Sequence, residues 1–261
     1  MGVQAMILRR LTHNLRTQNW TAISIELLIV IIGVIIGMQV SNWNQARIEK
    51  RETSQLLLEL RPALQSFIDF FDTAKVYYAT TRTYSDRAFA GWRRDPAVSD
   101  EQFVIAAYQA SQIYVIGLNG ENWAAIFGSD RLRDIANIEV RRRLTTIMTT
   151  NYDQIEIGAV ATRYREEVRR VIPEDIQDAI RAKCSDLPIP AKPLTLFLPP
   201  NCSLNLPNTH FAAAAAALRA RQDLVSELRW HRSATATFLS NLEAIDRETQ
   251  ALKRAIDETV D

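Results

Sequence analysis

Side chains that support catalysis or metal binding are few in this sequence and form none of the familiar motifs. The chain lacks the glycine-rich phosphate loop, the dinucleotide fingerprint, the zinc-binding H-E-x-x-H pattern and the G-x-S-x-G nucleophile pattern. Glu227 and His231 stand four residues apart, which would place two metal ligands on one face of a helix. His231 also falls on an apolar face, so we interpret it as a core histidine. We therefore predict no enzymatic activity, no cofactor and no metal site.

Two cysteines bound the proline-rich part of the chain. Cys184 and Cys202 flank a segment in which prolines recur, and we predict an excursion at 184–208 between helical segments. A disulfide there would clamp a loop that has no core of its own, and would contribute about 3 kcal/mol. Such a bond forms in an oxidising compartment. The alternative is a pair of unpaired thiols.

Glu26 directly precedes an apolar run, residues 27–38, which carries no charge. On a helix, Glu26 shares one face with Gly33 and Gly37, whose small-residue spacing lets two membrane helices approach closely. We favour a protonated Glu26 that forms a hydrogen bond across this face of an oligomer. The two alternatives are a proton- or ion-coupled site and a carboxylate that reaches the lipid headgroups.

The apolar run predicts a transmembrane helix over residues 19–43. Its core of about 21 residues would span about 31 Å, the thickness of the hydrocarbon part of a bilayer. Trp20 and Trp43 flank it where interfacial aromatic residues occur. A cleaved signal peptide is the alternative, but the residues around Met38 make a poor cleavage site. We therefore expect a retained, single-pass span.

Topology does not follow from the basic residues alone, because similar numbers of them lie on either side of the span. The short segment 1–18 is basic and contains no acid, so it is easily left in the cytoplasm. The predicted disulfide favours an oxidising environment for residues 44–261. We therefore expect a protein of the bacterial inner membrane with a periplasmic C-terminal domain.

Charge excludes one large class of partner. The chain has 31 Lys and Arg against 30 Asp and Glu, so it lacks the basic excess of a nucleic-acid-binding domain. We expect no nucleic-acid partner. The predicted partners are the membrane itself and either a second copy of the chain or another membrane protein.

The polar residues around the span carry a resemblance. Glu26, Gly33, Gln39 and the run Asn42–Asn44 spell E-x6-G-x5-Q-x2-N-W-N, which resembles a family of bacterial single-span membrane proteins whose domain has no known function. The resemblance implies a basic N-terminal segment, this span and a charged helical domain. It implies no activity, substrate or catalytic residue.

A second resemblance covers the span alone. The run ISIELLIVIIGVIIG is similar to the N-terminal helix of type IV pilins and pseudopilins, where a Glu follows a processed Gly. If Glu26 is matched to that Glu, Thr21 stands at the position of the Gly. We interpret the similarity as convergence on an apolar helix.

The rest of the chain predicts an all-α fold, an elongated helical bundle with long antiparallel helices. Apolar residues recur at three- and four-residue intervals over 57–78 and again over 224–256, and these two faces are expected to pack together. Pro62 should kink or end the first helix, and Thr209 should cap the last one. The expected residues of the two faces are Leu57, Leu60, Leu64, Phe67, Phe71, Ala74 and Tyr78, and Leu224, Leu228, His231, Thr235, Phe238, Leu242, Ile245, Thr249, Leu252 and Ile256.

Helix-start signals subdivide the middle of the chain. Ser99 with Gln102 predicts a capping box for a helix over about 100–116. Asn137 should cap a helix that reaches about residue 171, and Pro173 should open a short one. An aromatic group is expected to pack in the core, with pocket lining as the alternative: Tyr77, Tyr78, Tyr84, Phe89 and Trp92.

These features favour a membrane-anchored, non-enzymatic interaction or sensory module of the bacterial envelope. The alternatives are a structural or assembly factor of an envelope complex and an ion- or proton-coupled oligomer that uses Glu26. A sensory module should have a pocket between helices, whereas an assembly factor should expose an apolar patch. An ion-coupled oligomer needs Glu26 to face a wet cavity.

Overall fold

The computed structural model describes residues 20–114, 132, 135–150, 160–189 and 195–260. The basic segment 1–18 lies outside these residues. Within them the fold is mainly helical, with seven helices and two short strands. The elements are α2 (Trp20–Trp92), α3 (Asp100–Gln109), α5 (Ile138–Thr149), α6 (Arg163–Val171), α7 (Glu174–Cys184), β1 (Leu187–Pro188), β2 (Leu196–Phe197), α8 (Asn208–Ala220) and α9 (Asp223–Val260).

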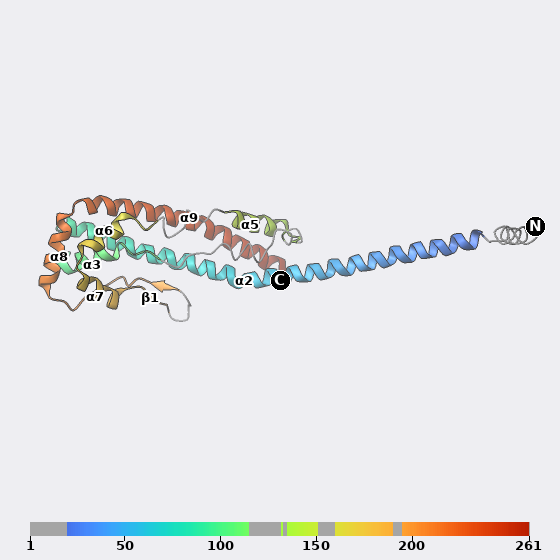
Figure 1. Ribbon diagram of the computed structural model, residues 1–261, viewed down its shortest axis with the longest axis horizontal. Helices are drawn as coiled ribbons and strands as arrows, with labels where there is room; N and C mark the ends of the chain where they lie inside the picture. Colours follow the sequence, from blue (N-terminus) through green and yellow to red (C-terminus); the bar gives the residue numbers. More distant parts are fainter. Residues whose placement is uncertain (1–19, 115–131, 133–134, 151–159, 190–194, 261) are drawn as a thin grey trace, which may run out of the picture. The chain divides into compact units, whose positions relative to one another are not determined.

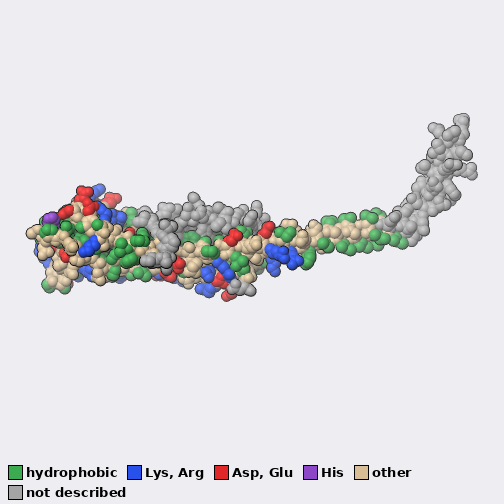
Figure 2. Space-filling model, turned by 90° about the horizontal axis from the view of Figure 1, so that it is seen from below, with side chains coloured by type: hydrophobic (Ala, Val, Ile, Leu, Met, Phe, Trp, Pro, Cys, Tyr) green, Lys and Arg blue, Asp and Glu red, His purple; other side chains and the backbone are tan. Residues whose placement is uncertain are grey.

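The chain divides into two units. The first ends at Ser54, and the second begins at Gln55. The described part of the first unit is the N-terminal section of α2, and its apolar side chains face outward. Figure 2 shows hydrophobic side chains along this section. Ile29 and Met38 in this section are 62% and 60% exposed. The most apolar stretch of 18 residues has a mean hydropathy of 1.8, and none of its residues is buried. By length and composition, this helix can cross a membrane.

The second unit begins where α2 acquires a buried face. The expected apolar residues of this face are buried except Phe67, which is partly buried against both core clusters. Tyr77 joins them, so the face is wider than a strict heptad pattern predicts. Pro62 does not end the helix, since α2 continues without interruption on both sides of it. The missing proline N–H removes one backbone bond, and the burial of Leu60 and Leu64 beside it holds the helix together.

The C-terminal part of the chain forms two helices rather than the one expected. α8 ends at Ala220 and α9 begins at Asp223, and the backbone of Arg221 between them leaves the helical region. The residue before α8 is Pro207, so Thr209 lies inside the helix and does not cap it. Proline is favoured at such a start because its φ angle is already suited to a helix and it lacks an N–H to satisfy.

Along α9, the buried face follows the predicted spacing, with Ala255 as an added buried residue and one exchange of position. Asp246 takes the buried position expected for Ile245, which is only partly buried. The exchange has an electrostatic cause, since Asp246 pairs with Lys75 on α2. An apolar pattern cannot reveal a charge that is buried with its partner.

Helices α2 and α9 run antiparallel within the second unit (Figure 1). Three ion pairs join them, and the residue numbers rise along α2 while they fall along α9. These pairs are Arg61–Asp257 at 2.7 Å, Lys75–Asp246 at 2.6 Å and Asp86–Arg232 at 2.6 Å. The expected packing of the two long helices is therefore confirmed.

α3, α5 and α7 begin at the predicted signals, but α3 and α5 end earlier than expected. Ser99 and Gln102 form the capping box of α3, which stops at Gln109. Asn137 accepts hydrogen bonds from two backbone N–H groups at the start of α5. The predicted continuous helix to residue 171 is wrong, because α5 ends at Thr149 and α6 starts at Arg163.

Two apolar clusters stabilise the bundle. The larger one gathers residues from the distal half of α2, from α3, α6, α7 and α8, and from the first half of α9. The smaller one joins the residues around Leu60 to α5 and to the end of α9. Within the larger cluster, α3 packs against α8, and α6 packs against both α8 and α9. α2 and α9 lie side by side along the bundle (Figure 1).

The proline-rich excursion contains a small antiparallel pair of strands. Leu187 pairs with Phe197, and Pro188 pairs with Leu196. The described parts of this segment follow α7, which ends at Cys184, and precede α8, which begins at Asn208.

Candidate functional site

A pocket of about 310 Å³ lies between α2 and α9. This volume is at the lower end of the range for small-molecule sites. α2 and α9 supply eleven of its twelve lining residues, and Ala110 at the end of α3 is the other. The lining consists of Tyr78, Thr81, Arg82, Ser85, Ala110, His231, Arg232, Thr235, Ala236, Leu239, Ser240 and Glu243.

Side-chain size explains why a space remains between two packed helices. The α9 residues that line the pocket form two rows, each with a four-residue spacing, and so share one face. Small side chains recur on this lining, including Ser85, Ala110 and Ala236. Larger side chains meet between the same helices, as where the lining residue Tyr78 packs against Phe238 with ring centroids 5.5 Å apart.

Two of the interhelical ion pairs bracket the pocket along the helices. Lys75 and Asp246 lie just beyond one end of the lining, and Asp86 pairs with the lining residue Arg232 at the other end. The pocket therefore occupies the interval between two points at which α2 and α9 are fixed to each other.

The charged lining residues belong to different parts of the pocket. Arg232 is held by Asp86 at 2.6 Å and lies over the ring of Phe89 at 5.5 Å. Glu243 stands eleven residues farther along α9, which corresponds to about 16 Å along the helix axis. One end of the pocket thus has Arg232 and the other has the carboxylate of Glu243.

His231 forms part of the inner wall. Its Nδ1 lies 2.8 Å from the hydroxyl of Thr162, and its ring packs against Tyr164 at 5.7 Å between centroids. Burial lowers the pKa of His231 to about 4, so the ring is neutral at pH 7. Among the residues that the structure describes, no group of three or more His, Cys, Asp or Glu is placed to hold a metal ion.

Most of the predicted aromatic group packs in the core. Tyr77, Tyr84 and Trp92 are buried, and the Trp92 indole donates a hydrogen bond to Leu218 O at 3.0 Å. Tyr78 is buried in the core and also lines the pocket. Burial raises the pKa of Tyr78 to about 12, and its hydroxyl accepts a hydrogen bond from the backbone N–H of Tyr114.

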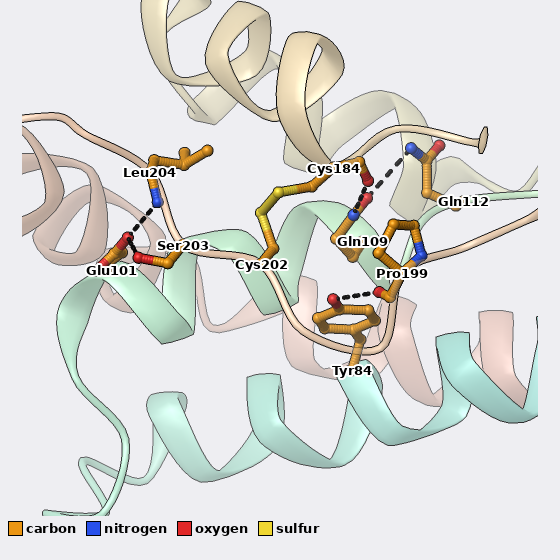
Figure 3. Close-up of a disulfide and its surroundings, with 9 residues drawn as sticks. All are labelled: Tyr84, Glu101, Gln109, Gln112, Cys184, Pro199, Cys202, Ser203 and Leu204. Atoms are coloured by element: carbon orange, nitrogen blue, oxygen red, sulfur yellow. Dashed lines mark hydrogen bonds between the residues drawn. A yellow bond between two sulfur atoms is a disulfide. The ribbon is translucent and has the colours of Figure 1, made fainter.

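Cys184 is the last residue of α7, and Cys202 lies between β2 and α8. A disulfide joins Cys184 to Cys202, with their Cα atoms 5.7 Å apart (Figure 3). The amide of Gln109 donates to Cys184 O at 2.6 Å, and the hydroxyl of Tyr84 donates to Pro199 O at 2.7 Å. These bonds fasten both ends of the excursion to α2 and α3.

A polar cluster lies close to this excursion. The hydroxyl of Tyr77 donates to Asp186 at 2.7 Å, and Arg165 and Arg169 both donate to Gln112. Burial raises the pKa of Asp186 and lowers the pKa values of the two arginines. The sequence analysis missed this cluster because its members lie far apart in the chain and form no motif.

The residues of the predicted oligomer face lie in the first unit. Glu26, Gly33 and Gly37 are all part of α2, and the side chain of Glu26 lies outside the described residues. A Cβ added at Gly33 or Gly37 would meet no atom within 4 Å. The outer surface of the helix is therefore open at both glycines.

Comparison of the chain with protein-family models, with curated proteins and with solved structures found no match.

Proposed function

We propose that this protein is a membrane-anchored, non-enzymatic sensory or interaction module of the bacterial envelope, and that the pocket between α2 and α9 is its ligand site. The observation that carries the proposal is the pocket itself. Its volume of about 310 Å³ suits a small molecule, and its lining combines an apolar floor with hydroxyl and charged groups.

The pocket residues of α2 support a sensory role because they belong to the same helix as the apolar segment. Tyr78, Thr81, Arg82 and Ser85 follow that segment on one continuous helix, Trp20–Trp92. A ligand that binds between α2 and α9 in one of two arrangements will favour that arrangement. Any change in α2 would then pass to the segment that we propose spans the membrane.

The proposed location is the inner membrane, with the helical domain in the periplasm. Two features support it, the exposed apolar section of α2 and the Cys184–Cys202 disulfide, which is typical of an oxidising compartment. The span signature E-x6-G-x5-Q-x2-N-W-N supports membership of the single-span family that it resembles. We further propose that the span associates with a second copy through Gly33 and Gly37.

Native mass spectrometry of the full chain, extracted from its own membranes in detergent, tests ligand binding. The variant Ala236→Trp fills the pocket from an exposed position on α9. The matched control is Ala244→Trp, which adds the same side chain at an exposed position outside the lining.

We expect the wild type and Ala244→Trp to carry a bound small molecule that Ala236→Trp lacks. A spectrum in which all three proteins carry the same masses would contradict the proposal that this pocket is the ligand site.

A further inference from the structure

We propose that the pocket takes a small carboxylic acid with an apolar body, and that the ligand carboxylate displaces Asp86 from Arg232. This inference rests on the proposed function, because it assigns a ligand class to the same pocket. It follows from how the charged groups around the pocket are paired.

Arg232 is the first of two cationic groups at this end of the pocket. Its ion pair with Asp86 is 2.6 Å long, and the Asp86 side chain is 62% exposed. An ion pair that is so open to water is weak, because solvent screens the two charges. Arg232 can therefore exchange Asp86 for a ligand carboxylate at small cost.

Arg82 is the second cationic group. It lines the pocket one helical turn before Asp86 on α2, and its side chain is exposed. Among the residues that the structure describes, it has no ion-pair partner. A carboxylate at this end would meet two guanidinium groups, which match its planar geometry and bind it through charge-assisted hydrogen bonds.

The rest of the lining selects an apolar body. Beyond the arginines, the apolar part of the lining is Tyr78, Ala110, Ala236 and Leu239, and Ser240 adds a hydroxyl. The hydroxyls of Thr81, Ser85 and Thr235 also line the pocket, but each donates a hydrogen bond to the backbone of its own helix. His231 contributes a neutral ring at pH 7 and therefore no second anchor for an anion. Glu243 repels a second carboxylate at the far end, so a monoacid is favoured over a diacid.

The geometry also gives the ligand a structural effect. Asp86 and Arg232 form one of the two ion pairs that bracket the pocket. A ligand that takes Arg232 releases α2 from α9 at this end, while Lys75 and Asp246 still hold the other end at 2.6 Å. Binding is thereby converted into a change in the contacts of α2.

The test compares para-fluorobenzoate with para-fluorobenzamide, a neutral molecule of nearly the same shape. Both are titrated by fluorine NMR into the full chain in detergent, with detergent alone as the blank. We expect the acid to bind at least tenfold more tightly than the amide, the equivalent of a charge-assisted hydrogen bond.

Three variants separate the parts of the argument. Arg82→Gln and Arg232→Gln should each weaken binding of the acid about tenfold and leave binding of the amide unchanged. Asp86→Asn removes the competing carboxylate and should strengthen binding of the acid, by up to about fivefold. Arg229→Gln, an exposed arginine of α9 outside the lining, is the control and should change neither.

Equal affinities for acid and amide, both lost in Ala236→Trp, would overturn the acid assignment while the pocket remained a ligand site. Weaker binding of the acid to Asp86→Asn than to wild type would overturn the displacement of Asp86. Absence of binding by either probe would also overturn the assignment, and the mass spectrometry described above would then judge the pocket separately.

Discussion

Lys75 Nζ lies 2.6 Å from Asp246 Oδ2, and the Asp246 side chain is only 4% exposed. The contact joins the two long helices across 171 positions of sequence. Asp246 also accepts a hydrogen bond from Gln250 at 2.9 Å, so its carboxylate is held from both helices. This pair fixes how α2 and α9 lie against each other beside the pocket.

Replacement of Lys75 by Met should therefore destabilise the protein. It leaves the Asp246 carboxylate buried without its cation, and the expected loss is about 2 kcal/mol because Lys75 itself is partly exposed. Lys253→Met is the control, since Asp257 keeps its contact with Arg61 at 2.7 Å. Thermal unfolding of the full chain in detergent measures both. Equal melting temperatures for Lys75→Met and Lys253→Met would show that the buried pair does not stabilise the bundle.

Reduction of the disulfide should lower the stability of the protein. Cys184 and Cys202 are separated by 18 positions, and a loop of that size contributes about 3 kcal/mol when it is cross-linked. The melting temperature should fall on addition of reductant, and a Cys184→Ala, Cys202→Ala double variant should melt at the reduced value with or without reductant. A reduced protein, verified by mass, that melts like the oxidised one would contradict this account.

Acid should destabilise the bundle through His231. Its pKa is lowered to about 4 in the folded protein by burial, whereas an exposed histidine has a pKa near 6.5. The unfolded chain therefore binds the proton more tightly, and stability falls as the pH drops from about 6.5 to about 4. The loss over this window is about 3 kcal/mol and is absent above pH 7.

Chemical unfolding at a series of pH values measures this loss, and His231→Gln should reduce it because the amide does not titrate. His210→Gln is the control, since the His210 side chain is 49% exposed and pairs with Asp175 at the surface. If His210→Gln removed the acid sensitivity and His231→Gln kept it, the assignment to His231 would be wrong.

The three glycines that the structure describes in α2 should respond differently to a larger side chain. An added Cβ at Gly91 would lie 2.1 Å from Cδ2 of Phe103, so Gly91→Ala should cost about 2 kcal/mol.

Gly33 and Gly37 have open space, so leucine there should leave the melting temperature unchanged. Under the proposed association, Gly37→Leu should instead weaken the oligomer, as measured by light scattering in detergent. An unchanged oligomer mass would place the interface elsewhere.

Local signals in the sequence predict two of the helix starts through their caps, because a cap is a contact between near neighbours, whereas the predicted Thr209 cap is wrong. The Ser99–Gln102 capping box and the Asn137 cap are both confirmed. The apolar faces of α2 and α9 are also largely confirmed, since periodicity reports burial directly. Helix ends were less predictable, as the break at Arg221 shows, because it depends on how α8 turns across the bundle.

The site was less accessible to sequence reasoning. Its lining mixes alanines, hydroxyl residues and arginines that read as an ordinary helix surface, and only packing of distant segments turns them into a pocket. The buried Asp246 shows the same limit, because its partner Lys75 is brought to it by the fold alone.

The most direct test of the central claim asks whether the state of the pocket is communicated along α2. In the chain, both native cysteines are joined in a disulfide, so a Gly37→Cys variant offers one free thiol for cross-linking between copies in the membrane. Cross-linking is then compared in the Gly37→Cys protein alone, with Ala236→Trp and with Ala244→Trp. The account predicts that Ala236→Trp, which fills the pocket, changes the cross-linked fraction, while Ala244→Trp leaves it unchanged. The same cross-linked fraction in all three proteins would contradict it.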